Sequence, residues 1–235
     1  MKNRISIIIP ALNEEKNIKP LTKKIIKNLK NIKYEIIFVD DNSIDQSKSV
    51  LLNLSKKYKF FNPILRRKAR DLTQSCFDGI NKSKYPDILI MDADLQHNPK
   101  YIPIIYKKFT EGYDVVIGAR KLTSGRNKGL TEFRRFASVI LIFLFKIFNI
   151  KTSDPMSGFF VFKKKLFKKN KKFYFGKGFK ILADILINSR EKLKTKDIYI
   201  DFNRRYESES KMNFKILLIL IQFYFRSLFK KLLIS

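Results

Sequence analysis

The 235 residues of the chain fit one domain of ordinary size with a modest appendage, and are too few for two full domains with a linker. Hydrophobic residues make up 45% of the chain and only 8 residues are glycine, which excludes a disordered or fibrous polymer. The single cysteine, Cys76, cannot form an internal disulfide, and the single histidine, His97, excludes a Cys/His metal site. We therefore expect a reduced, intracellular compartment.

The net charge of +29 has two explanations that the sequence leaves open. The cations are mostly lysine and are spread along the whole chain, as a lysine-biased codon usage would produce. The other explanation is a partner with negative charge, either anionic lipid head groups or phosphorylated ligands.

The first 120 residues alternate between strand and helix patterns, which predicts a parallel sheet flanked by helices. Strands are expected at 4–9, 34–39, 63–66, 87–91 and 114–118, and helices at 14–29, 43–57, 72–81 and 99–111. After Arg120 we expect a mobile loop over 121–130 that bears Arg126 and Lys128. An apolar helix at 137–150, a loop at 153–162, a helix at 181–189 and a strand at 197–202 should follow.

Two apolar stretches, at 137–150 and near the C-terminus, are candidates for contact with a membrane. The apolar run at 216–225 would reach only about 15 Å as a helix, roughly half the thickness of a bilayer core. Its extension would place Arg226, Lys230 and Lys231 in the membrane, so we expect a helix that lies on the membrane surface. The alternative is that both helices pack on the core or on each other. The polar residues on one side of the C-terminal helix are Lys215, Gln222, Arg226 and Lys230.

Polar residues directly follow three of the predicted strands, at 10–15, 40–43 and 92–97. A doubly wound sheet binds its ligand beyond these carboxyl ends. Each acidic pair alone is explained as a helix cap, but three together indicate a ligand site. No glycine-rich loop follows the first strand, which excludes the dinucleotide fingerprint and the P-loop.

Asp92, Asp94 and Gln96 alternate along a segment that we expect to be extended, so their side chains should face one way. Mg²⁺ and Mn²⁺ prefer oxygen ligands such as carboxylates and amides. When bound by a few protein oxygens, these ions keep coordination positions for substrate phosphates. The spacing therefore predicts a metal site that bridges a diphosphate. We expect His97 to be structural and to help fix this loop.

Six motifs carry a family resemblance over nearly the whole chain: SIIIPALNEEKNI (6–18), YEIIFVDDNSIDQS (34–47), ILIMDADLQHNP (88–99), VVIGAR (115–120), DPMSGFFVFKK (154–164) and RYESESK (205–211). The sequence resembles the inverting family-2 glycosyltransferases with the GT-A fold, in particular the dolichyl- or polyprenyl-phosphate mannosyltransferase branch. The resemblance implies an α/β fold, a doubly wound and mainly parallel sheet flanked by helices, with C-terminal amphipathic interfacial helices.

The resemblance also assigns residues to a nucleotide-sugar donor. It implies that Pro10, Leu12 and Glu14 line the nucleotide, and that Val39 and Asp41 contact the base and ribose. Leu12 stands where an aromatic residue is common in the family, which would change the stacking on the base.

The resemblance further places Asp92 and Ala93 at the diphosphate sugar, and Asp94 and Gln96 at the metal beside Asp92. Ser208 replaces the glycine usual in the last motif, but no charged group is lost. We expect Asp92, Asp94 and a set of cations to be catalytic, the cations holding the phosphates of donor and acceptor. These cations are Arg120, Arg134, Arg205 and Lys211.

The implied reaction moves mannose from GDP-mannose onto a polyprenyl or dolichyl phosphate with inversion. The leaving diphosphate must be neutralised, whereas the phosphate acceptor is already ionised and needs positioning more than a general base. The alternative is a polyprenyl-phosphate glucosyltransferase, or another family-2 transferase that uses a UDP-sugar.

Three other classes fit the sequence less well. Residues 10–18 contain no glycine, which disfavours a nucleotidyltransferase, and the absence of tryptophan disfavours a processive polysaccharide synthase. A nucleic-acid-binding protein would leave the acidic clusters unexplained, so no nucleic-acid partner is expected. We expect a GT-A glycosyltransferase domain at 1–212, including an apolar amphipathic helix at 131–150, and a basic apolar helix at 213–235. The enzyme would be cytoplasmic, peripheral on the cytoplasmic face of a membrane, and aided by a membrane-anchoring partner.

Overall fold

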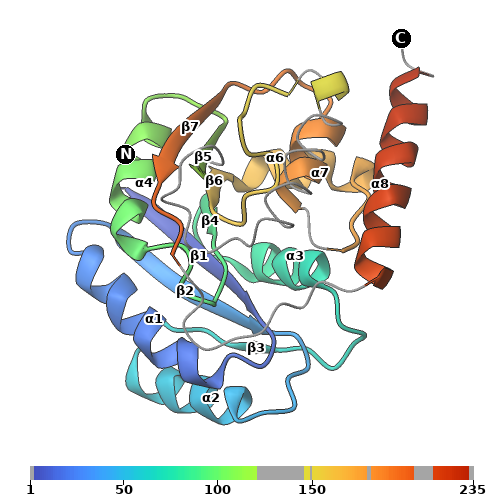
Figure 1. The fold of residues 1–235 in the computed structure, drawn as a ribbon. Coiled ribbons are helices and arrows are strands. Elements are labelled where there is room, and N and C mark those ends of the chain that lie inside the picture. Colours follow the sequence, from blue (N-terminus) through green and yellow to red (C-terminus); the bar gives the residue numbers. More distant parts are fainter. Residues whose placement is uncertain (1–2, 121–145, 149, 179–180, 204–213, 233–235) are drawn as a thin grey trace.

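The computed structural model describes residues 3–120, 146–148, 150–178, 181–203 and 214–232 (Figure 1). The expected loop at 121–130 and most of the expected helices at 131–150 lie outside these residues. Within the expected apolar stretch, Lys146–Phe148 forms a short 3₁₀ turn, η2.

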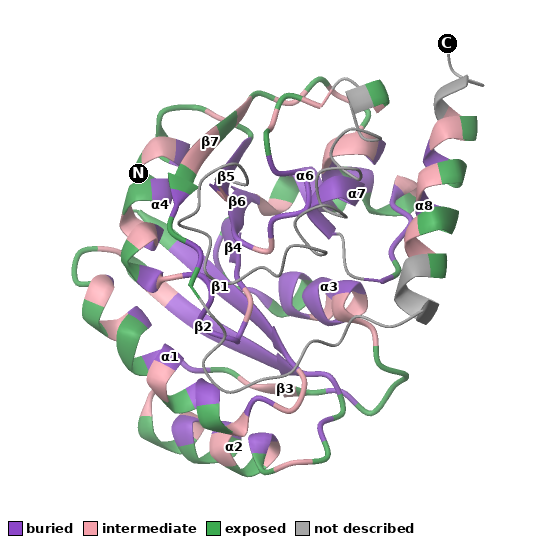
Figure 2. Ribbon diagram, viewed as in Figure 1, coloured by how far each residue is buried: buried purple, intermediate pink, exposed green. Residues whose placement is uncertain are grey.

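The described residues form one seven-stranded sheet, in the order β3-β2-β1-β4-β6-β5-β7. β1 pairs in parallel with β2 and β4, whereas β6 lies antiparallel between β4 and β5. Helices cover both sides of the sheet, and Figure 2 shows the central strands as largely buried. Their apolar residues therefore pack on both faces. The strands are β1 Arg4–Ala11, β2 Lys33–Asp40, β3 Ile64–Leu65, β4 Asp87–Ile90, β5 Val115–Arg120, β6 Phe160–Lys163 and β7 Thr195–Ile200.

Alternate residues of the strands feed two separate hydrophobic clusters. On one face Ile5, Ile7 and Ile9 of β1 pack with α1 (Glu15–Asn28), α2 (Ser47–Lys57) and α4 (Ile102–Thr110). On the other face Ile8 packs with α3 (Leu72–Lys82), α6 (Lys164–Asn170) and α7 (Ile181–Asn188). Short 3₁₀ turns, η1 (Pro99–Tyr101) and η3 (Lys171–Phe173), precede α4 and follow α6.

The expected doubly wound, mainly parallel sheet is confirmed, and the bounds of two expected elements are wrong. The segment expected as a loop at 153–162 contains the start of β6, and the unexpected helix α6 follows it. The run that forms β6 has only four residues between Phe159 and a lysine-rich helix, too short for its period to distinguish a strand from a loop. The helix expected from residue 43 begins only at Ser47, because residues 43–46 bond to Asn13 in the loop after β1 and to Glu15 at the start of α1.

The C-terminal helix α8 (Phe214–Leu232) packs against the domain through one face. Phe223, 3% exposed, joins Met156, Phe175 and Ala183 in a third hydrophobic cluster. Lys230 donates to the carbonyl oxygen of Phe173 at 3.3 Å. Apolar side chains also point outward, and we call them the outer stripe of α8. They are Leu218, Ile221, Phe225 and Phe229, between 44% and 63% exposed.

The outer stripe recurs every three or four residues, so it forms one side of α8, opposite to Phe223. Figure 2 shows the outward side of this helix as largely exposed. Among the helices of the described chain, none combines the length and apolar character that a membrane span requires.

Candidate active site

The loops that follow β1 and β2 bind each other. Asn13 and Asn42 both have positive φ, 54° and 62°, which turns the chain sharply at the end of each strand. The main-chain N–H of Asn13 donates to Ser43 Oγ at 2.9 Å, and the N–H of Ile44 donates to Asn13 Oδ1 at 3.0 Å. Part of the polarity at these strand ends is therefore structural.

The residues assigned to the nucleotide lie at this sheet edge with different exposures. Pro10 is buried, Leu12 is half-buried, and Glu14 is 6% exposed and accepts a 2.6 Å hydrogen bond from Asn17 Nδ2. The side chain of Val39 is fully buried in the apolar cluster beneath α3. Because its 0% exposure covers the main chain as well as the side chain, Val39 offers a ligand no accessible surface in this structure.

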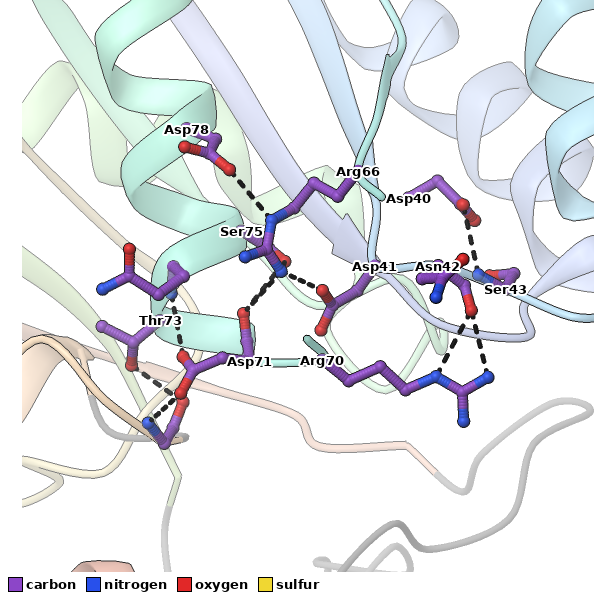
Figure 3. Close-up of polar contacts among 12 residues, drawn as sticks. Asp40, Asp41, Asn42, Ser43, Arg66, Arg70, Asp71, Thr73, Ser75 and Asp78 are labelled. Atoms are coloured by element: carbon purple, nitrogen blue, oxygen red, sulfur yellow. Dashed lines mark hydrogen bonds and ion pairs between the residues drawn. The ribbon is translucent and has the colours of Figure 1, made fainter. Parts of the chain in front are cut away.

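Asp41 forms an ion pair with Arg66, which follows β3 (Figure 3). The side chains of both residues are nearly fully buried, 6% exposed for Asp41 and 4% for Arg66. Arg66 Nε also donates to Asp78 Oδ2 at 2.9 Å, and its Nη1 donates to Ser75 Oγ at 3.0 Å. Burial raises the pKa of Asp41, an effect that Arg66 and the hydrogen bonds oppose.

Arg66 joins β2, β3 and α3 at the carboxyl-end edge of the sheet, and it is not among the residues predicted from the sequence. The available signal was a pair of arginines immediately after a strand, at the same sheet edge as the acidic clusters. Beside it, Arg70 donates to the carbonyl oxygen of Asn42 at 3.0 and 3.3 Å (Figure 3). Asp71 caps α3 by accepting from the N–H of Gln74 at 2.9 Å.

The segment after β4 turns instead of continuing as a strand, so the expected extended conformation of residues 92–96 is wrong. β4 ends at Ile90, and Leu95 has φ +62°. The N–H of Gln96 donates to Asp94 Oδ1 at 3.1 Å, which holds the turn. Asp94 and Gln96 are 7% and 5% exposed, and the Asp92 side chain is 37% exposed.

His97 lies beneath Asp92 and is 2% exposed. Its ring packs between Phe159 and Phe202, at centroid distances of 5.4 and 5.3 Å, and its Nδ1 lies 3.6 Å from Asp92 Oδ2. Burial lowers the pKa of His97 to about 4, so the ring is neutral at pH 7. These contacts agree with the expected structural role.

Gln96 connects this turn to the chain after β7. Its Nε2 donates to the carbonyl oxygen of Asn203 at 3.1 Å, and the N–H of Asn203 donates to the carbonyl oxygen of Gln96 at 3.1 Å. The residues that follow Asn203 include two of the expected phosphate-binding cations. These two, Arg205 and Lys211, and also Arg134, lie outside the described residues.

Arg120, at the carboxyl end of β5, forms a two-pronged pair with Asp154. Its Nε and Nη2 donate to the two carboxylate oxygens at 2.7 Å each, and its N–H donates to Oδ2 at 3.1 Å. Asp154 is fully buried. Asp154 therefore fixes the guanidinium of Arg120, a role that the sequence analysis did not assign although the motif at 154–164 was recognised.

The family of the chain follows from comparison with known proteins. The family model described as "Glycosyl transferase family 2" matches residues 6–171, which include most of β1, all of β2 to β6 and the carboxyl-end clusters described above. The chain belongs to glycosyl transferase family 2.

The curated relatives include proteins named dolichol-phosphate mannosyltransferase. The one from Pyrococcus furiosus is 34% identical over 90% of this chain, and the chain spans 60% of that relative's length. The one from Saccharomyces cerevisiae is 31% identical over 94% of this chain and 86% of its own length. An undecaprenyl-phosphate 4-deoxy-4-formamido-L-arabinose transferase from Proteus mirabilis is 33% identical over 59% of this chain and 42% of its own length.

Solved structures support the same fold at much lower identity. Glucosyl-3-phosphoglycerate synthase from Mycobacterium tuberculosis, in complex with Mn²⁺, uridine diphosphate and glucosyl-3-phosphoglycerate, superimposes with a TM-score of 0.70 at 17% identity. The match covers 97% of this chain and 79% of that chain. The likeness confirms the expected GT-A fold class.

Proposed function

We propose that the chain transfers mannose from GDP-mannose to a polyprenyl or dolichyl phosphate with inversion. The observation that carries this proposal is the similarity to the Saccharomyces cerevisiae dolichol-phosphate mannosyltransferase, which extends over 94% of this chain and 86% of that one. The acidic clusters after β1, β2 and β4, which a binding module would not need, support an enzymatic site at the same sheet edge.

The nucleotide of the donor would lie over the carboxyl ends of β1 and β2. Pro10, Leu12 and Glu14 would line it, and Val39 and Asp41 would contact the base and ribose. Arg66 supports the role of Asp41 because it holds the buried carboxylate in one orientation. A carboxylate held in one orientation can accept a hydrogen bond from the base or the ribose without first losing conformational freedom.

The residues after β4 fit a divalent cation. Asp92, Asp94 and Gln96 offer oxygen ligands of the kind that Mg²⁺ and Mn²⁺ prefer, and Ala93 lies between the two carboxylates. Among the described residues no three His, Cys, Asp or Glu side chains gather as a metal site, so substrate phosphates would complete the coordination. The charge of the leaving diphosphate would be neutralised by such an ion.

The acceptor phosphate would be held by cations around this centre. Arg120 is fixed by Asp154. Gln96 binds Asn203, which precedes Arg205 and Lys211 in the sequence. Arg134 is the fourth cation proposed for this role. A lipid phosphate is ionised at neutral pH, so these residues would orient the nucleophile without a general base.

We propose that the membrane surface is also a partner, since a lipid acceptor is rarely met in bulk water. The outer stripe of α8 supports contact with lipid, and Phe223 on its inner side supports attachment of the helix to the domain. In this proposal residues 1–212 form the catalytic unit and 213–235 the helix at the membrane. The enzyme would act on the cytoplasmic face, with a membrane-anchoring partner and no nucleic acid.

A second candidate is a polyprenyl-phosphate transferase that uses a UDP-sugar, such as a glucosyltransferase. This second candidate is supported by the similarity to the Proteus mirabilis transferase, whose name specifies undecaprenyl phosphate and a sugar other than mannose.

A single assay separates the two candidates. The protein is incubated with polyprenyl phosphate and labelled GDP-mannose, UDP-glucose or UDP-GlcNAc, and the label in the organic phase is counted. Label from GDP-mannose alone is the expected result. Label from a UDP-sugar alone would replace the first candidate by the second, and no label from any donor would contradict both.

A further inference from the structure

We propose that Gly158 is a positioning residue for Asp92, because its missing side chain leaves the space that the Asp92 carboxylate occupies. A Cβ atom built on Gly158 would lie 2.7 Å from both Cγ and Oδ1 of Asp92, and closer still to Oδ2. Real Cβ atoms essentially never approach other atoms within 3.0 Å. With a side chain at position 158, either the carboxylate or the main chain must therefore shift. The inference rests on the proposed function, which assigns Asp92 to the donor diphosphate and its metal.

Gly158 is needed for space and not for backbone conformation. The described glycines with positive φ are Gly112, Gly176 and Gly178, and Gly158 is not among them. Its main chain would accept alanine without strain, since the penalty of a side chain in the left-handed region does not apply here. The three nearest atoms to the built Cβ all belong to the Asp92 carboxylate. The contact with Asp92 is thus what favours glycine at this position.

The main chain around Gly158 is fixed from both sides. Ser157 Oγ donates to the carbonyl oxygen of Gly118 in β5 at 2.7 Å, and the N–H of Phe159 donates to Ser157 Oγ at 3.1 Å. The N–H of Gly118 donates to the carbonyl oxygen of Phe159 at 2.8 Å, and Phe159 is fully buried. Since this segment is bound to β5, the more easily moved partner is the half-buried side chain of Asp92.

His97 limits the movement of Asp92 on another side. Its Nδ1 lies 3.6 Å from Asp92 Oδ2, and its ring is held between Phe159 and Phe202. The carboxylate therefore lies between the main chain at Gly158 and a buried ring. The antiparallel insertion of β6 next to β4 brings these two parts of the chain together.

The first experiment measures the binding of GDP and of UDP by calorimetry, with and without MnCl₂, in the wild-type protein and in Gly158→Ala. We expect the affinity with Mn²⁺ to fall at least tenfold for the nucleotide that the wild type binds, and the metal-free affinity to change much less. A general loss of protein stability would not by itself lower the affinity with Mn²⁺ more than the affinity without it. Gly112→Ala is the control. A Cβ atom at this position meets nothing within 4 Å, but the backbone of Gly112 has a φ of +96°, which disfavours alanine. The substitution should lower Tm and leave both affinities unchanged.

The second experiment is a double-mutant cycle of Gly158→Ala with Asp92→Ala. Once the carboxylate is removed, Gly158→Ala should cause little further loss of nucleotide affinity, so the two effects should not multiply. Wild-type affinity in Gly158→Ala, or effects that multiply in the double variant, would overturn the proposal.

Thermal stability keeps the test informative if Gly158→Ala alone fails to fold. The double variant should then recover a cooperative transition near that of Asp92→Ala, because the overlap has been removed. A double variant that also fails to fold would overturn the contact. An unchanged metal-linked affinity in Asp92→Ala would instead contradict the donor role of Asp92, which separates a failure of the proposed function from a failure of this inference.

Discussion

Arg66 and Asp41 form an ion pair at the boundary between the sheet and the proposed nucleotide site. Arg66 follows β3, and its main-chain N–H donates to the carbonyl oxygen of Asp40 at 2.9 Å, so the register of β3 on β2 brings the two side chains together. Figure 3 shows the guanidinium between Asp41 on one side and Asp78 and Ser75 of α3 on the other. The pair thus links the edge strand β3, the end of β2 and the helix α3.

Loss of Arg66 should destabilise the fold in a pH-dependent manner. Arg66→Met leaves the buried carboxylate of Asp41 without its cation, which typically costs about 3–5 kcal/mol at neutral pH. Without Arg66 the pKa of Asp41 in the folded state rises further above its value in the unfolded chain. Stability then falls as the pH rises between the two values. Urea unfolding should show a small deficit near pH 4 and the full deficit at pH 7.

The matched control for this change is Arg70→Met. Arg70 is exposed and contacts the carbonyl oxygen of Asn42, so its loss should cost within about 1 kcal/mol at both pH values. A deficit of equal size at pH 4 and pH 7 in Arg66→Met would show that the charge of Asp41 is not the cause.

Transfer should depend on a divalent cation through Asp94. Asp94→Asn keeps an acceptor for the N–H of Gln96 but removes the negative charge. We expect a loss of about 3 kcal/mol of transition-state stabilisation, or roughly two orders of magnitude in kcat/KM, with Tm nearly unchanged. Activity should also disappear in EDTA and return with MgCl₂ or MnCl₂. Full activity in EDTA, or in Asp94→Asn, would be incompatible with the metal site.

The phosphate-binding role of Arg205 can be tested by a conservative change. Arg205→Lys retains the charge but loses the planar fork that binds two phosphate oxygens at once. We expect lower turnover in Arg205→Lys and a larger loss in Arg205→Ala, measured as kcat and KM for the lipid phosphate. Unchanged kinetics in Arg205→Ala would mean that this cation is only part of the solvated surface.

The outer stripe of α8 should bind membranes without holding the fold together. Phe225→Ser and Phe229→Ser should each weaken pelleting with anionic liposomes by about 1–2 kcal/mol, roughly fivefold to thirtyfold, and leave Tm unchanged. High salt should release part of the bound protein, and neutral liposomes should bind it more weakly.

Phe223→Ala is the corresponding control on the inner side of α8. This buried side chain should contribute about 3–5 kcal/mol to stability, seen in urea unfolding. Deletion of 214–235 should lower stability for the same reason. If the outer-stripe variants pellet as the wild type does, α8 is not the anchor and the stretch at 137–150 becomes the better candidate.

The local pattern of the sequence determined most of the elements and their order. Strands such as β1 and β2 are mostly apolar because helices cover both faces, and the polar clusters after them mark their carboxyl ends. The motifs also determined the family, since residues 6–171 match it. These features depend on neighbours in the chain, which a sequence displays directly.

Only the tertiary structure decided which distant residues meet. Arg66 lies 25 residues from Asp41, and Asp154 lies 34 residues from Arg120, so neither pair has a local signature. The turn at Leu95, with its positive φ, replaced the extended alternation that the spacing of Asp92 and Asp94 predicted. The place of Gly158 under Asp92 depends on the insertion of β6 between β4 and β5. The order of the strands is set by the packing of the whole sheet. The four residues of β6 are too few for their hydrophobic period to predict that strand or its place in the order.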